Sequence, residues 1–291
     1  MKLTAGERSF GYVNTVLMIG LCVVTLYPFL YVLFASLSNA TSFLQHRGLL
    51  LAPVGLDFGA YKAVFDNPMI AKGYQNTLLY VTLGTSINLV MTAIGAYVLS
   101  RTGLFFKNIL MFFIVVTMVF HGGLIPTYLL VNDLGMMNSM WALIIPGAIN
   151  TFNMIIMRTA FQGVPVSLEE SARMDGANDW TILFRIIIPL SMPVIAVMIL
   201  WYAVGHWNSY FSALVYLRNR EAYPLQLVLR EILIANNTDS MMTGAASDDK
   251  YAIGETIKYA TIIVSTLPII CLYPFLQKYF VKGVMIGAIK E

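Results

Sequence analysis

The chain has 291 residues, of which 58% are hydrophobic and only 11% are charged, and its formal net charge is +3. Ordinary soluble domains contain about 45–50% apolar and about 25% charged residues. So few charges cannot cover the surface of a soluble domain that has this much apolar side chain to hide, and the apolar content also excludes a disordered chain. The small, scattered net charge does not indicate a nucleic-acid partner. A polytopic membrane protein remains.

Six stretches of the chain contain no Asp, Glu, Lys or Arg. In chain order they are Ser9–Gln45, Gly73–Ser100, Asn108–Asn132, Leu134–Met157, Ile186–Leu217 and Tyr259–Gln277. A bilayer core is crossed by about 20 helical residues, whereas the strands of a membrane barrel have about 10 residues in strict alternation. Backbone groups in lipid must also be hydrogen-bonded within the segment. The sequence therefore predicts an all-α polytopic membrane protein with six transmembrane helices.

The basic residues predict which side of the membrane each loop faces. If both termini are cytoplasmic, the inner segments carry 10 Lys and Arg in 58 residues and the outer segments carry 8 in 81. Basic residues favour the cytoplasmic side, so both termini are predicted to be cytoplasmic. The densest part of the first apolar stretch, Tyr12–Leu37, is longer than the about 7–15 residues of a signal-peptide core. It is therefore expected to remain as a membrane anchor.

Two outer segments are long enough to have structure of their own. Residues 38–72 are interpreted as a loop with a short helix near Ala60–Phe65. In the other segment, apolar residues at helical spacing predict an amphipathic helix over Leu225–Ile234 on the outer surface, followed by a polar loop at 236–250. The two cysteines, Cys22 and Cys271, both lie in apolar stretches and are interpreted as separate buried thiols.

Several chemistries are missing from the sequence. It contains no Gly-Lys-Ser/Thr phosphate loop, no HExxH and no GxSxG motif, and its three histidines are scattered. Neither an enzymatic activity nor a cofactor or metal is expected. No charged residue lies deep in a predicted span, although proton relays and ion-coupled carriers usually need one. If the protein pumps a solute, the energy is expected to come from another chain.

The segment between the fourth and fifth spans is the most informative part of the chain. Ser167 is predicted to cap a short helix, with Glu170 three residues later completing a capping box. Asp175-Gly176 is predicted to end this helix, and Asn178 or Asp179 to cap a second one. Two short helices with charges and exposed apolar residues are typical of a docking element for a partner protein. The alternative is an amphipathic loop that rests on the lipid headgroups.

The order of residues in this segment resembles the EAA motif of binding-protein-dependent ABC importer permeases. The matching residues are Glu170-Ser171-Ala172, Gly176, Ile186 and Ile188-Pro189, with Ser171 and Ile188 as mild departures and with Asp175 and Ala177 extending the match. Other stretches are similar to the oligosaccharide branch of that family, which includes the maltose-permease G-type and the lipoprotein/polysaccharide-type C subunits. These stretches are Gly73–Thr77, His121–Tyr128, Trp207-Asn208 and Tyr279–Val284.

The resemblance implies a type I ABC importer permease with a cytoplasmic coupling helix. It implies three parts: an N-terminal helix and outer loop (1–72), a transmembrane domain (73–282) whose EAA loop spans 158–189, and a cytoplasmic tail (283–291). The coupling helix would sit in a cleft of a separate ATPase subunit, where Glu170 would pair with a basic residue. The residues implied in ATPase coupling are Glu169, Glu170, Ala172, Arg173, Asp175, Gly176 and Ala177.

The resemblance also implies the partners and the location of the protein. The expected partners are a second homologous permease, a dimer of ATPase subunits, an extracytoplasmic solute-binding protein and an oligosaccharide substrate. The chain would form half of a sugar pathway in the bacterial cell membrane. Sugar recognition needs amides and aromatic faces, so the candidate pathway residues are His121, Asn150, Asn153, Trp207, Asn208 and Tyr210. The alternatives are hydrogen bonding between helices for the asparagines and interfacial anchoring for the aromatic residues.

A different class of function is an ATP-independent secondary carrier or facilitator. Such a protein needs no docking loop, and it usually shows internal half-repeats or buried ionisable groups. Neither feature is evident in the sequence. The hypothesis of an intramembrane enzyme is rejected because the sequence shows no nucleophile with a neighbouring base.

The orientation can be tested by cysteine labelling. A cysteine at position 179, in a variant that lacks Cys22 and Cys271, should not react with a membrane-impermeant reagent in intact cells. It should react after the membrane is permeabilised, because the segment from Arg158 to Arg185 is predicted to be cytoplasmic. Ready labelling in intact cells would reverse the orientation.

Overall fold

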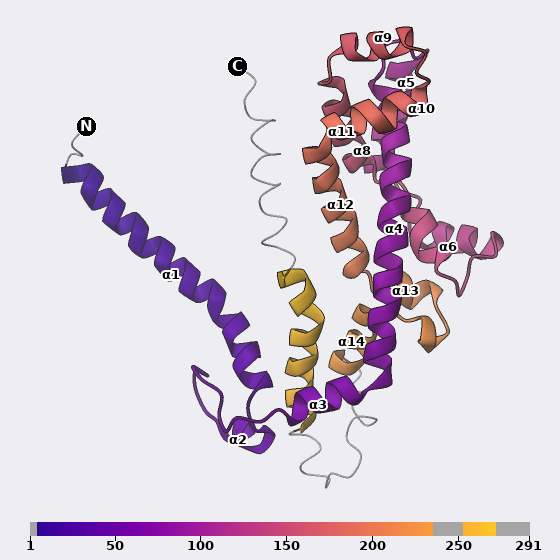
Figure 1. Ribbon diagram of the computed structural model, residues 1–291. Coiled ribbons are helices and arrows are strands. Elements are labelled where there is room, and N and C mark those ends of the chain that lie inside the picture. The colour runs from indigo at the N-terminus through magenta and orange to yellow at the C-terminus, as the bar shows by residue number, and fades with distance from the viewer. Residues whose placement is uncertain (1–4, 235–252, 272–291) are drawn as a thin grey trace. The chain divides into compact units, whose positions relative to one another are not determined.

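The computed structural model describes residues 5–234 and 253–271, and its regular elements in these ranges are helices (Figure 1). They are α1 (Ala5–Ser36), α2 (Ala40–Gln45), α3 (Gly59–Asp66), α4 (Pro68–Ser100), α5 (Lys107–Val119), α6 (Leu124–Asp133), α7 (Trp141–Ile144), α8 (Thr151–Gln162), α9 (Val166–Met174), α10 (Asp179–Ile182), α11 (Ile188–Leu190), α12 (Met192–Trp207), α13 (Phe211–Tyr216) and α14 (Leu225–Ile234), followed by a helix at Ile253–Cys271. The predicted all-α fold and the short helices near 60–65 and 225–234 are confirmed.

Some of the sequence predictions lie outside the described residues. These are the polar loop at 236–250, the end of the sixth apolar stretch beyond Cys271, the resemblance at Tyr279–Val284 and the tail at 283–291.

Three helices in the described ranges are long and apolar enough to cross a membrane alone: Gly6–Ser36, Pro68–Ser100 and Ile253–Cys271. Three further pairs of helices pass the same test only when each bent pair is taken together, which brings the number of candidate spans to six. The bend between α5 and α6 is 111°. The segment Trp141–Gly147, which contains α7, meets α8 at 52°, and the segment Asp179–Leu190, which contains α10 and α11, meets α12 at 89°. Half of the candidate spans are therefore interrupted helices.

The third candidate span is broken between α5 and α6. Helix α5 ends at Val119 and α6 begins at Leu124, so Phe120, His121 and the two following glycines form the connection. Gly123 has a φ of +88°, a conformation that an L side chain rarely adopts. The glycine pair thus turns the chain, and the carbonyl of Gly123 accepts both the side-chain hydroxyl of Thr127 at 2.8 Å and its backbone N–H at 3.4 Å.

The fourth span differs from the prediction of a helix beginning near Leu134. Regular helix begins only at Trp141, because Gly135 and Asn138 have φ values of +68° and +57°. An asparagine tolerates this left-handed conformation when its side chain finds local partners. The Oδ1 atom of Asn138 accepts the backbone N–H groups of Arg218 and Asn219, both at 2.9 Å. A structured turn therefore replaces the first part of the predicted helix.

The fifth span also differs from the prediction, which was one helix over Ile186–Leu217. The helical segment includes the predicted second helix of the loop, which begins at Asp179, and it then bends at Ser191 and ends at Trp207. Residues Leu183–Ile187 form a π-helical turn just before Pro189. A proline lacks the N–H group of a regular helix and clashes with the preceding turn, and Pro193 repeats this constraint beyond the bend. Two prolines on either side of Ser191 explain why this apolar stretch is not one straight helix.

The described residues fall into two compact units. One comprises the residues up to Ile70 and those from Leu229 to Leu267, and the other comprises Ala71–Val228 with the residues after Leu267. In the first unit, the rings of Tyr31, Phe43 and Tyr259 meet edge to face at 5.6–6.4 Å between centroids. This aromatic cluster joins the end of α1 to α2 and to the helix at Ile253–Cys271.

The prediction that both cysteines are buried is wrong for this chain. Cys22 and Cys271 are both free and exposed. Much of α1 is likewise exposed, although the helix is mostly apolar after Ser9. An apolar helix of a membrane protein borders lipid or a partner helix as well as its own chain, so an apolar sequence does not by itself imply burial within the chain.

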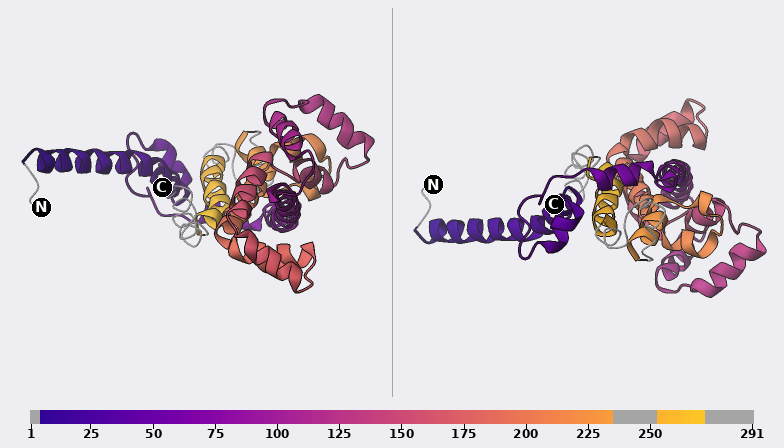
Figure 2. Two further views of the ribbon diagram at one scale, coloured as in Figure 1. Left: turned by 90° about the horizontal axis from the view of Figure 1, so that it is seen from above. Right: turned by 90° about the horizontal axis from the view of Figure 1, so that it is seen from below.

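The core of the second unit is built around α4 (Figures 1 and 2). Small side chains of α4, Ala93 and Ala96, let larger residues such as Met154 and Met198 pack closely. Polar groups of α4 then join the helices at specific points. Thr92 shares a hydrogen bond of 2.7 Å with the hydroxyl of Tyr202 in α12. The hydrophobic effect does not drive helices together in a membrane, because lipid tails are as apolar as the helices. Hydrogen bonds of this kind therefore fix the positions of the helices relative to one another.

One contact of α4 with α12 is unusually close. His206 Nε2 lies 3.2 Å from Asn88 Oδ1, and the Asn88 amide donates to the carbonyl of Gly147 at 2.8 Å. A Cβ atom added to Gly84 would lie only 2.5 Å from the ring of His206. Glycine at position 84 is therefore what allows the imidazole to approach the helix and reach Asn88.

Replacing Gly84 should destabilise the second unit. Gly84→Ala should displace His206 and lower the stability of the folded chain by about 1–3 kcal/mol, the usual cost of overpacking. Thermal unfolding of the purified protein in detergent measures this effect. Gly205→Ala is the matched control, because it lies in α12 with nothing within 4 Å of the added atom. Equal melting temperatures for the two variants would contradict the close packing at Gly84.

Candidate functional site

The EAA loop, residues 158–189, contains the short helix α9, whose start differs from the prediction. Helix α9 begins at Val166, and Pro165 occupies the cap position without a side-chain hydrogen bond. The predicted cap at Ser167 and its capping box with Glu170 are therefore wrong. Pro165 holds an extended backbone that leads directly into the helix, so Ser167 and Glu170 both lie inside it. The carboxylate of Glu169 lies in the first turn, where it complements the helix dipole.

The end of α9 is the glycine turn that the sequence predicts. Gly176 has a φ of +82°. Its N–H donates to the carbonyl of Arg173 at 3.0 Å, and the N–H of Ala177 donates to the carbonyl of Ala172 at 2.9 Å. These two bonds form a Schellman motif, which requires a left-handed residue at position 176. Open space surrounds the Gly176 α-carbon, so its backbone conformation, and not crowding, calls for glycine here.

The second helix of the loop begins at the expected cap. Asn178 Oδ1 accepts the backbone N–H of Thr181 at 2.9 Å, so Asn178 is the cap of α10 and Asp179 is not. The Asp179 carboxylate has a different role: it accepts from Arg173 at 2.5 Å and from the hydroxyl of Tyr97 at 3.2 Å. Asp179 therefore ties the start of α10 to both α9 and α4.

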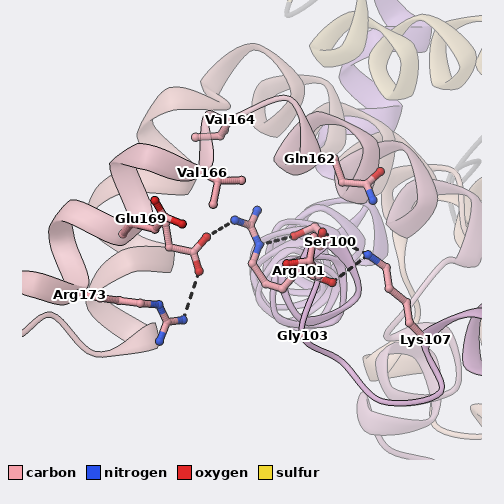
Figure 3. A pocket seen from close by; sticks show the side chains of 11 residues that line it. Ser100, Arg101, Gly103, Lys107, Gln162, Val164, Val166, Glu169 and Arg173 are labelled. Atoms are coloured by element: carbon pink, nitrogen blue, oxygen red, sulfur yellow. Dashed lines mark hydrogen bonds and ion pairs between the residues drawn. The ribbon is translucent and has the colours of Figure 1, made fainter.

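Glu169 is the buried charge of the site (Figure 3). Its residue is only 7% exposed, and its two carboxylate oxygens have separate partners. One oxygen pairs with the guanidinium of Arg101. The other accepts from Arg173 at 3.2 Å and lies 3.4 Å from the Tyr97 hydroxyl. A buried carboxylate is costly unless it is paired and hydrogen-bonded, and here both conditions are met.

Arg101, at the end of α4, was not among the predicted site residues. Its guanidinium pairs with Glu169 and also donates to the carbonyl of Phe161 at 2.9 Å and to the hydroxyl of Ser100 at 2.9 Å. It also lies over the ring of Tyr97, 5.1 Å from its centroid. The sequence signal was present: Arg101 is one of only two basic residues between the second and third predicted spans. Its partner on α9 could not be identified from spacing alone.

A hollow of about 510 Å³ lies beside this ion pair. Arg101 and Lys107 line one side of it, and Glu169, Glu170 and Arg173 line another. The Lys107 ammonium donates to the carbonyl of Arg101 at 2.8 Å, as Figure 3 shows. The hydrogen bond with Glu169, followed by the charge of Asp179, raises the pKa of Arg173 above its ordinary value. Both contacts favour the charged form of the Arg173 guanidinium.

The opposite side of α9 is open. Ser167, Glu170, Ser171 and Met174 follow one another at helical spacing, and all four are exposed. Met174 is 90% exposed, and the stacked rings of Trp180 and Phe184 are also accessible. The small side chains Ala172 and Ala177 pack instead against the core of the second unit. We call the four exposed residues the outward face of α9. Exposed methionine and aromatic side chains, such as Met174, Trp180 and Phe184, are of the types that are enriched in protein-binding surfaces.

The predicted coupling residues thus divide between two sides. Glu169, Ala172 and Ala177 lie toward the body of the unit, whereas Glu170, Asp175 and Gly176 are exposed. Arg173 is half exposed and joins the two acidic residues Glu169 and Asp179.

The candidate pathway residues do not form one cluster. Asn150 caps α8 by accepting the N–H of Asn153 at 3.1 Å, and its own N–H donates to Tyr202. Asn153 is 7% exposed, so its side chain lies inside the unit. At the end of α12, Trp207 is buried and meets the ring of Tyr74 edge to face at 6.1 Å between centroids. The remaining candidates, His121, Asn208 and Tyr210, are exposed.

The pattern of helices and the EAA loop defines a membrane component of a transport system. The family model described as "Binding-protein-dependent transport system inner membrane component" matches residues 90–286, and the chain belongs to this family. It is thus a permease subunit, whose family role is transport across the membrane.

Individual similar proteins give more detail than the family model does. The chain is 40% identical over 273 residues to the "Polygalacturonan/rhamnogalacturonan transport system permease protein YtcP" of Bacillus subtilis, and the alignment covers 93% of each chain. It is 39% identical over 295 residues to "Protein LplC" of the same organism, covering 100% of this chain and 98% of that protein. A solved structure of a bacterial ABC transporter "involved in the import of the acidic polysaccharide alginate" contains a chain with 36% identity and a TM-score of 0.87, covering 96% of this chain and 99% of that one.

The left-handed conformation of Gly176 leads to a prediction about the stability of the loop. Gly176→Ala should cost about 1–2 kcal/mol because the side chain must adopt the left-handed conformation. This loss should speed hydrogen exchange at the N–H of Ala177 by about 5- to 30-fold. Gly176→Asn should have a smaller effect, since asparagine tolerates this conformation. Gly103→Ala is the control, because Gly103 has no positive φ and nothing near its added atom. Unchanged exchange in Gly176→Ala would contradict the Schellman turn.

Proposed function

We propose that this chain is the permease subunit of an ATP-driven ABC importer and that α9 is its coupling helix. The observation that carries the proposal is the outward face of α9. Glu170 and Met174 are exposed there, next to a turn whose geometry is held by Gly176 and Asn178. A helix fixed on one side and unpartnered on the other is suited to fit a cleft of a separate protein.

The same proposal assigns the partners and the orientation. The chain would assemble with a second homologous permease, two ATPase subunits and an extracytoplasmic solute-binding protein. The EAA loop and both termini would lie on the cytoplasmic side of the bacterial cell membrane, with six spans between them. Closure of the ATPase dimer would move two coupling helices together and switch the permease pair between inward- and outward-open states. The division into an N-terminal part (1–72), a transmembrane domain (73–282) and a tail (283–291) belongs to this proposal.

The transported substrate is proposed to be an oligosaccharide or a fragment of a polysaccharide. The names of the relatives support this class: one refers to polygalacturonan and rhamnogalacturonan, and the solved structure to alginate. Within this chain, the exposed residues His121, Asn208 and Tyr210 are candidates to contact the sugar. Asn150, Asn153 and Trp207 are better suited to shape the pathway, because they are occupied in caps or buried contacts.

Charge reversal at Glu170 tests the coupling helix. Glu170→Arg should weaken the association of the ATPase with the permease pair at least about tenfold, equivalent to about 1.4 kcal/mol, because it places like charges at the docking cleft. The measurements are co-purification of the ATPase and ATP hydrolysis stimulated by the loaded binding protein, both per assembled complex. The spans are unchanged, so membrane insertion and pairing with the second permease should persist.

The matched control is Asp133→Arg, which makes the same charge reversal on another exposed position at the end of α6. It should leave ATPase association unchanged. Normal ATPase association and normal transport by the Glu170→Arg variant would contradict the assignment of α9 as the coupling helix. Transport by the purified chain alone in liposomes, without ATP, would instead support an ATP-independent carrier.

A further inference from the structure

Two adjacent glutamates of α9 have opposite surroundings. Glu169 is 7% exposed and paired, whereas Glu170 is exposed on the outward face. Neighbouring residues of a helix point about 100° apart, so the two carboxylates face different directions although both residues line the hollow beside the ion pair. The proposed coupling role uses Glu170 toward the ATPase. It leaves open what the buried Glu169 does.

The buried carboxylate joins α9 to helices that are distant in the sequence. Glu169 binds Arg101, which lies 68 residues earlier in the chain at the end of α4. Arg101 in turn holds the carbonyl of Phe161 in the last turn of α8, at 2.9 Å. A second arginine repeats this connection, because Arg158 of α8 donates to the carbonyl of Leu99 in α4 at 2.9 Å. One guanidinium therefore contacts the ends of α4 and α8 and the first turn of α9.

The backbone alone joins α9 to its neighbours weakly. Residues Gly163–Pro165 connect it to α8, and residues 175–178, which include the left-handed Gly176, connect it to α10. A short helix between two turns that contain glycine can tilt without moving the longer helices. Side-chain contacts must therefore carry a displacement of α9 into α4. The charged contacts available are Arg101 with Glu169, supported by Tyr97 and Asp179.

We infer that Arg101 is a positioning residue for coupling: through Glu169 it ties α9 to the ends of α4 and α8, so that these elements move together. This inference rests on the proposed coupling function of α9. A buried ion pair adds little net stability, but removing one partner leaves the other charge unpaired. Its benefit here is a defined geometry, because the planar guanidinium can hold a carboxylate and a carbonyl at fixed angles.

The inference predicts the loss of coupling without the loss of assembly. Glu169→Gln and Arg101→Met should leave ATPase association normal, since the outward face with Glu170 is unchanged. The amount of sugar transported per ATP hydrolysed should fall about tenfold in each variant, because motion of α9 no longer reaches α4. The double variant should fall by about the same factor as either single variant, as expected when two residues act through one interaction.

Two further variants separate positioning from general stability. Arg101→Lys keeps the charge but cannot hold Glu169 and the Phe161 carbonyl together, so its transport per ATP should be intermediate. Glu255→Gln removes a carboxylate from an ion pair with Lys258 in the other unit, and it should behave as the unmodified protein. All measurements use the complete reconstituted importer and are expressed per assembled complex.

Each outcome bears on the inference separately from the proposed function. Normal transport per ATP in Glu169→Gln and Arg101→Met, with Glu170→Arg impaired, would overturn the role of Arg101 and leave the coupling helix intact. Loss of ATPase association in the two variants would overturn it as well, because the pair would then serve only to fold the docking surface. Normal coupling in Glu170→Arg would remove the proposed function itself.

Discussion

The need to satisfy every backbone polar group away from water governs this structure. A continuous helix meets the need by itself, whereas each interruption leaves N–H and C=O groups that require other partners. The bends at His121–Gly123, Ala148–Asn150 and Ser191 are such interruptions. At Asn150 the side chain caps the next helix, and at Asn138 the side chain accepts two N–H groups from a distant turn. Polar residues in the apolar stretches are thus used to repair broken helices.

Much of the fold followed from composition and periodicity. The stretches without charged residues located the candidate spans. The positions of the breaks depend on details that hydropathy does not report. Pro189 and Pro193 bend the fifth span, and left-handed Gly135 and Asn138 delay the fourth helix. Burial within the chain was also unpredictable, because a residue such as Cys22 can be apolar and yet face outward.

The candidate site was only partly predictable for a similar reason. Local signals identified the turn at Gly176 and the cap at Asn178, since both depend on neighbours within a few residues. The first cap was wrong because Ser167 matched a capping pattern while Pro165 already set the start of the helix. Arg101 was missed because its partners, Phe161 and Glu169, lie 60 and 68 residues away. Long-range pairing of charges needs the three-dimensional arrangement of α4, α8 and α9.

The short length of α9 has a consequence for how this loop tolerates change. The helix is bounded by Pro165 at one end and by left-handed Gly176 at the other, so its rotation about its own axis is set from both sides. Inserting one residue between Pro165 and Glu169 would turn one part of the helix relative to the other by about 100°. Glu170 would then face the body of the unit or Glu169 would face outward. The number of residues between Pro165 and Gly176 therefore matters as much as the identity of those residues. The loop should accept substitutions far more readily than insertions or deletions.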